Sequence, residues 1–128
     1  MNEGVMSRTR KDTVVIIDDD EAIRDSTAAL LTSAGFSVKT YGSGSEFLKS
    51  HDESAVSCLV IDCQMPDFDG FTLVDRLASN GAHAPVIMMT GNCGRSTKIR
   101  ARKAGAVAIL EKPFSVELLL DAIRRALG

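Results

Sequence analysis

Acidic, hydroxyl and basic side chains follow four apolar segments of this sequence, at positions where they could act together. Asp18 and Asp19 follow VVII, Asp62 ends CLVID, Thr90 ends VIMMT, and Lys112 comes just after AIL. Carboxylates that lie close together at the edge of a core repel one another and lose hydration, so the arrangement calls for a bound cation. Carboxylate oxygens suit Mg²⁺, and a lysine with a threonine could hold the oxygens of a phosphoryl group. These residue types therefore indicate a magnesium-dependent phosphoryl site.

The elements that must position these side chains alternate along the chain. Short apolar segments, mostly rich in β-branched residues, predict strands at 13–17, 37–41, 57–62, 86–90 and 106–110. The patterns between and after them predict helices at 21–34, 44–51, 70–79, 95–104 and 116–127. This alternation predicts an α/β fold with right-handed crossovers and a parallel, doubly wound sheet of five strands. Ligands bind beyond the carboxyl ends of the strands in such a sheet, where the acidic and basic side chains stand.

Glycine and serine positions support the predicted helix ends. Gly35, Gly81 and Gly105 stand where helix C-caps are expected, and Ser115 is placed to cap the last helix. Asp20 is expected to cap the first helix, where a carboxylate meets the positive end of the helix dipole. Asp20 is therefore not expected to bind metal.

Composition and charge describe an ordinary globular domain. The 128 residues include 45% hydrophobic and 25% charged residues, which is enough for one sizeable core. Fifteen basic and 17 acidic residues give a formal net charge of -2, which argues against a domain built to bind nucleic acid directly. We find neither a membrane-spanning run nor a secretory signal, so we expect a cytoplasmic protein with no membrane partner. We also expect a flexible tail at 1–12, one domain at 13–128, and reduced thiols, because the spacing of Cys58, Cys63 and Cys93 matches no metal site.

Four motifs carry a resemblance to a known family. VVIIDDDEAIR, CLVIDCQMPDFDG, VIMMTG and ILEKPF, in this order and spacing, resemble the receiver domain of two-component response regulators over about residues 13–127. The resemblance implies the flavodoxin-like (βα)5 receiver fold with strand order 2-1-3-4-5. GSEFL and EKPFS favour the FixJ-type transcriptional subgroup. Whether the chain is a single-domain regulator or the receiver part of a longer protein stays open.

The resemblance also implies roles for the acidic residues. Asp62 would be the phosphoacceptor, taking a phosphoryl group from the histidine of a sensor histidine kinase or phosphotransfer protein. Asp19, Asp62 and the backbone carbonyl of Gln64 would contact Mg²⁺ directly, and Asp18 would act mostly through water. Such a protein turns over no external substrate.

Further roles concern the switch and the output surface. Thr90 would bond a phosphoryl oxygen, and Lys112 would pair with Asp62 or its phosphate and would be followed by a cis peptide bond. Ile109 occupies the position where receivers usually carry Tyr or Phe, so rotation of an aromatic ring cannot report the state of Thr90. Residues 95–127, which begin with a basic helix, would form the output face, with an acidic partner or a second copy of the domain; the alternative is a solvated charged surface.

Two other classes of protein share parts of the pattern. A haloacid dehalogenase-type phosphatase also combines an aspartyl nucleophile, Thr, Lys and Mg²⁺, and Asp18-x-Asp20 imitates its first motif. Its acidic motif after the lysine would have to come from Glu117 or Asp121. A flavodoxin-like binding module has the same topology, but Asp18 and Asp19 would repel a bound phosphate.

Overall fold

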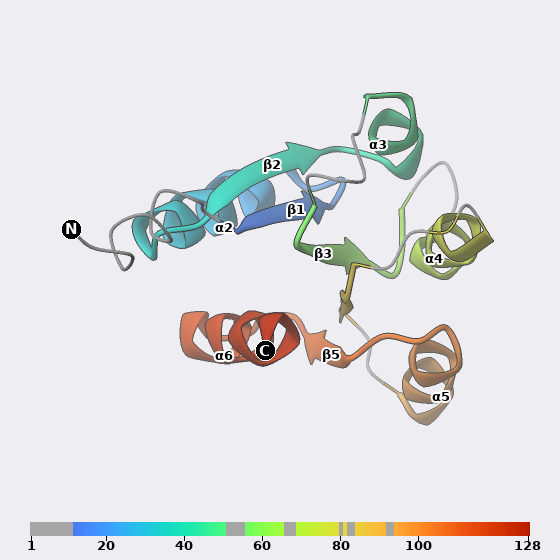
Figure 1. The fold of residues 1–128 in the computed structure, drawn as a ribbon. Coiled ribbons are helices and arrows are strands. Elements are labelled where there is room, and N and C mark those ends of the chain that lie inside the picture. Colours follow the sequence, from blue (N-terminus) through green and yellow to red (C-terminus); the bar gives the residue numbers. More distant parts are fainter. Residues whose placement is uncertain (1–11, 51–55, 66–68, 80, 82–83, 92–93) are drawn as a thin grey trace.

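A parallel sheet forms the centre of the molecule (Figure 1). The computed structural model describes residues 12–50, 56–65, 69–79, 81, 84–91 and 94–128. The strands are β1 (Thr13–Ile17), β2 (Ser37–Tyr41), β3 (Cys58–Asp62), β4 (Val86–Thr90) and β5 (Ala108–Glu111). They pair in parallel in the order β2-β1-β3-β4-β5, which confirms the predicted fold class and strand order.

Helices cover both faces of this sheet (Figure 1). They are α2 (Glu21–Ser33), α3 (Gly44–Ser50), α4 (Gly70–Ser79), α5 (Arg95–Lys103) and α6 (Val116–Leu127). One core cluster joins alternate strand residues to α2 and α6, and includes Val14, Ile16, Val60, Leu31, Leu119 and Ile123. The other joins the remaining strand residues to α3, α4 and α5, and includes Val15, Ile17, Ile61, Phe47, Leu73 and Ala101. Strands buried on both faces read as continuous apolar runs, which is why VVII, CLVI and VIMM lack polar alternation.

The expected element boundaries hold to within a residue or two. The largest difference is at β5, which was predicted at 106–110 and spans Ala108–Glu111. Ala106 instead closes α5, because its N–H donates to the carbonyl of Ala101 at 3.0 Å while Gly105 N–H donates to Arg102 at 3.1 Å. Gly105 takes a φ of 95° to make this turn. Apolar character alone does not distinguish such a helix-closing residue from the first residue of a strand.

The first turns of α2 and α6 are capped by side chains, as predicted. Asp20 Oδ1 accepts hydrogen bonds from the N–H groups of Ala22 and Ile23 at the start of α2. Ser115 Oγ accepts from Leu118 N–H at the start of α6. Gly35 and Gly81 have positive φ, at the turns where C-caps were expected. Within the described ranges, we find no helix with the length and apolar character needed to cross a bilayer.

Two sequence-based expectations fall on undescribed residues. The proposed tail at 1–12 lies outside the described ranges apart from Asp12, and Cys93 lies outside them too. Cys58 and Cys63 are both buried free thiols, as expected of reduced cysteines.

Candidate functional site

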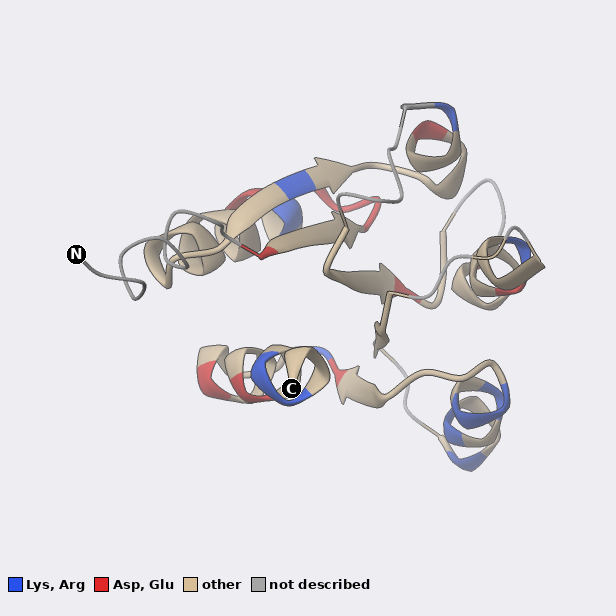
Figure 2. Ribbon diagram, viewed as in Figure 1, with Lys and Arg blue, Asp and Glu red and all other residues tan. Residues whose placement is uncertain are grey.

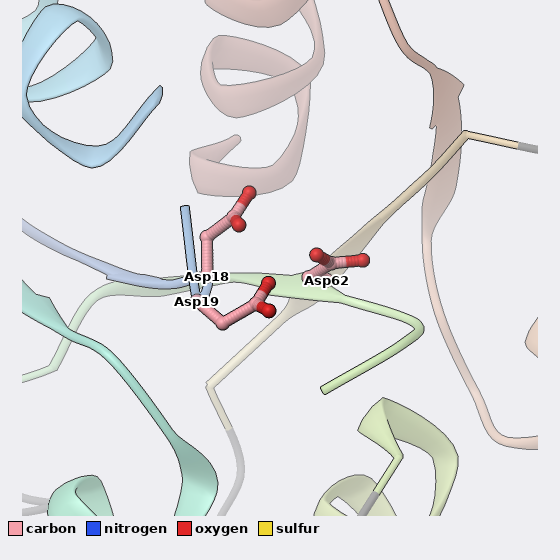
Figure 3. Close-up of side chains that lie close together, drawn as sticks. All are labelled: Asp18, Asp19 and Asp62. Carbon is pink, nitrogen blue, oxygen red and sulfur yellow. The ribbon is translucent and has the colours of Figure 1, made fainter. Parts of the chain in front are cut away.

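Three carboxylates meet at the carboxyl edge of the sheet. Ile17 of β1 pairs with Ile61 of β3, so the residues that follow, Asp18 and Asp62, stand side by side. Asp19 comes next along the loop, and one carboxylate oxygen from each of the three aspartates lies within 4.8 Å of the others (Figure 3). Asp18 is 0% exposed and Asp62 is 6% exposed, whereas Asp19 is exposed. The sequence-predicted acidic cluster is therefore present, with two of its members removed from water.

Lys112 connects two of these carboxylates. Its Nζ donates to Asp18 Oδ2 at 2.7 Å and to Asp62 Oδ2 at 3.1 Å. The lysine follows β5, at the far end of the strand order β1-β3-β4-β5, so its side chain extends past the end of β4 to reach both partners. Its own N–H donates to the Thr90 carbonyl at 2.7 Å, and the peptide bond to Pro113 is cis, as expected. Lys112 contacts both buried aspartates at once, not Asp62 alone.

The local electrostatics shift two pKa values. Burial raises the pKa of Asp62 and the charge of Asp18 acts in the same direction, while the Gln64 N–H and the Lys112 ammonium oppose them. For Lys112, burial alone would lower the pKa, but the hydrogen bonds and charges of Asp18 and Asp62 outweigh burial and raise it. Lys112 is therefore held in its charged form, and Asp62 is less acidic than a solvated aspartate.

The other predicted site residues lie at the same edge or behind it. Thr90 is the last residue of β4, 2% exposed and paired in register with Glu111. Gln64 is exposed, and its N–H donates to Asp62 Oδ1 at 3.0 Å, which orients the carboxylate. Ile109 lies on β5 opposite Met88 and packs against the core cluster on the α3, α4 and α5 face.

Arg24, which the sequence reasoning missed, and Gly70 support Asp18 and Asp62. Arg24 Nη1 donates to the Asp18 carbonyl at 2.7 Å, and Asp18 Oδ1 accepts from the Asp20 N–H at 2.9 Å. Gly70 begins α4 against the backbone of Asp62, and its N–H donates to the Cys63 carbonyl at 2.9 Å. The predicted cap at Asp20 could have indicated the contact of Arg24, because it places residue 24 one turn into α2, beside the end of β1.

The donor set fits a hard divalent cation. The ion pairs of Asp18 and Asp62 both come from Lys112, and Asp19 has no hydrogen bond or ion pair among the described residues. Three carboxylates beside one ammonium retain a net negative charge, which Mg²⁺ would offset through oxygen ligands. Asp121, one of the two candidates for the acidic motif of a phosphatase, pairs with Arg125 at 3.1 Å on the exposed side of α6.

Comparisons with known proteins agree with this geometry. The family model of the response regulator receiver domain matches residues 14–124. The response regulator protein TodT of Pseudomonas putida is 38% identical over 118 residues, which are 92% of this chain and 52% of TodT. The transcriptional regulatory protein FixJ of Azorhizobium caulinodans is 40% identical over 115 residues, which are 90% of this chain and 54% of FixJ.

A solved structure gives the same result for the fold. The crystal structure of FixJ-N superimposes with a TM-score of 0.82 at 38% identity, covering 92% of this chain and 94% of that one. The chain spans about half the length of the curated relatives named above.

Proposed function

This chain belongs to the response regulator receiver domain family, and from that membership we propose that it accepts a phosphoryl group on Asp62 in a Mg²⁺-dependent reaction. The proposed donor is the phosphohistidine of a sensor histidine kinase or phosphotransfer protein. The observation that carries the proposal is the contact of one lysine, Lys112, with both Asp18 and Asp62 beside the carboxylate of Asp19.

The proposed transfer uses the carboxylate of Asp62 as nucleophile. One Asp62 oxygen forms a bond to phosphorus while the bond from phosphorus to the donor nitrogen breaks, and the leaving imidazole keeps that electron pair. A carboxylate is a poor nucleophile towards an anionic donor, and bound Mg²⁺ would reduce the repulsion and offset the charge that develops on the phosphoryl oxygens. Asp19, Asp62 and the Gln64 carbonyl would hold this ion directly, with Asp18 in support.

Lys112 and Thr90 would receive the transferred group. The ammonium of Lys112 already lies 3.1 Å from Asp62 Oδ2, so it would pair with a phosphoryl oxygen after transfer. Thr90 ends the neighbouring strand β4, and its hydroxyl would donate to another oxygen. A Cβ added at Gly91 would meet nothing within 4 Å, which leaves room for the phosphoryl group beside the backbone.

Mass spectrometry tests this assignment directly. The protein is incubated with acetyl phosphate with and without Mg²⁺, and we expect one added phosphoryl group, located on Asp62, only when Mg²⁺ is present. Asp62→Asn should abolish the labelling, while Asp20→Asn, which keeps a good N-cap, should label as the wild type does. Labelling that persists in Asp62→Asn, or in the presence of a chelator, would refute the assignment. Turnover of a generic phosphatase substrate would favour the enzyme alternative instead.

The proposed output surface is the 95–127 face. Basic residues cover α5 (Figure 2), and Val107, just before β5, and Leu118 of α6 are 57% and 55% exposed. We propose that this face associates with a second copy or with an acidic partner, and that Ile109 transmits the movement of Thr90 by aliphatic packing. Sedimentation with and without beryllofluoride tests the homodimer.

The proposal further includes a cytoplasmic location, a flexible tail at 1–12 and no direct contact with nucleic acid.

A further inference from the structure

One basic side chain of α5 differs from the others in where it lies. The guanidinium of Arg100 lies over the ring of Phe71, 4.1 Å from its centroid, and Nη2 is 3.5 Å from Asp69 Oδ2. Both partners stand at the beginning of α4. By contrast, Arg95, Lys98 and Arg102 line a groove on the outer side of α5 with Ile99. Arg100 therefore joins two helices that are separate in sequence.

The two carboxylate oxygens of Asp69 make different contacts. Oδ1 accepts from the N–H of Thr72 at 2.9 Å and from its hydroxyl at 3.0 Å, which caps α4. Oδ2 faces Arg100. Burial alone would raise the pKa of Asp69, but the Thr72 hydrogen bonds and the charge of Arg100 outweigh it, and the net shift is downward. The carboxylate is thus charged and oriented at neutral pH.

The start of α4 is in turn fixed to the backbone of Asp62. Gly70 N–H donates to the Cys63 carbonyl at 2.9 Å, and a Cβ at Gly70 would collide with the carbonyl oxygen of Asp62. Gln64, the next residue after Cys63, donates to the Asp62 carboxylate. A displacement of Asp69 or Phe71 would therefore reach Asp62 through one tightly packed glycine.

From these contacts we propose that Arg100 is a positioning residue, which holds the start of α4 against α5 and so couples the position of α5 to ligand binding at Asp62. This inference rests on the proposed function. With Ile109 in place of an aromatic ring, the coupling runs through α4 and the acceptor backbone rather than through ring rotation. Arg100 is 59% exposed on its side chain, so the effect is modest, like that of other exposed ion pairs and ring contacts.

The experiment measures beryllofluoride affinity by calorimetry in saturating Mg²⁺. Arg100→Ala should bind about two- to five-fold more weakly than the wild type, the size that such an exposed contact supports. The matched control is Arg102→Ala, which removes the same charge from the same helix but leaves Asp69 and Phe71 in place; it should bind as the wild type does. Urea unfolding of each variant identifies any general loss of stability.

A second pair of variants separates coupling from structure. Asp69→Asn keeps an N-cap side chain and removes the charge that faces Arg100, so it should reproduce part of the loss. The double variant should lose less than the sum of the two single changes, because both remove the same contact. In parallel, the amide NMR signals of α5 should respond less to beryllofluoride in Arg100→Ala than in Arg102→Ala.

Two results would overturn the inference in distinguishable ways. If the wild type is labelled on Asp62 but Arg100→Ala and Arg102→Ala bind and respond alike, Arg100 is only a surface contact and the proposed function stands. If Asp62 of the wild type is not labelled at all, the proposed function fails and the coupling fails with it.

Discussion

Gly70→Ala should destabilise the protein although alanine is the better helix former. The added Cβ would collide with the carbonyl oxygen of Asp62 and would approach Ile61 Cγ2 and Met88 Cε at 3.0 Å each. A side-chain end can rotate away, but a backbone carbonyl at the end of a central strand cannot. Overpacking of this kind costs roughly 1–3 kcal/mol. Alanine recovers at most about 1 kcal/mol of helix propensity, so we expect a net loss of about 1 kcal/mol in the free energy of unfolding.

Urea unfolding measures this loss, with Gly91→Ala as the matched control. With a slope of about 2 kcal/mol/M, the midpoint for Gly70→Ala should fall by about 0.5 M. Gly91 has no left-handed φ and open space around its Cβ position, so its variant should keep the wild-type midpoint or gain slightly. Because the strain falls on the Asp62 backbone, Gly70→Ala should also be labelled more slowly by acetyl phosphate. Equal midpoints for the two variants would refute the packing argument.

Three further expectations follow from the same contacts. Lys112→Ala should lower the free energy of unfolding by about 3 kcal/mol, because it leaves buried Asp18 without its ion pair. Mg²⁺ should restore part of the lost stability, as measured by urea midpoints with and without the ion. A Mg²⁺ effect on the variant no larger than that on the wild type would contradict this expectation. Asp20→Ala should cost about 1 kcal/mol through the lost cap and leave Mg²⁺ affinity unchanged in a calorimetric titration. Burial raises the pKa of the Cys58 thiol from 9.0 to about 12, so above pH 9 the unfolded chain loses a proton that the folded chain keeps. The contribution of this thiol to stability is therefore complete below pH 9 and decreases as pH rises towards 12; urea midpoints at pH 8 and 10 should decrease more in the wild type than in Cys58→Ala.

The fold and the acidic cluster could be predicted because both follow from short-range patterns. Apolar runs fix the strands, and a parallel sheet brings residues just past the strands to one edge, so Asp18 and Asp62 had to meet. Which partner Lys112 contacts could not be predicted, because a four-carbon side chain can reach either carboxylate. The geometry that decides between them is set by strand order and twist, and here it allows both.

The contacts of Arg100 with α4 could not be predicted from the sequence, for a different reason. Within a run of basic residues, only the rotation of α5 about its axis decides which side chain faces α4. Ile99, the largest apolar residue of this helix, is 45% exposed, whereas the smaller Ala101 is buried. In a short helix with few apolar residues, the buried face cannot be identified from hydrophobic periodicity alone.

The contacts of Lys112 also bear on how the domain is made in the cell. Its two partners lie 94 and 50 residues earlier in the chain. Synthesis proceeds from the N-terminus at about 5–20 residues per second, so the acidic residues leave the ribosome seconds before the lysine that balances them. During that interval β1 and β3 can pair, but their carboxylates have no ammonium to share. Lys112 therefore balances the two buried carboxylates only once β5 has joined the sheet.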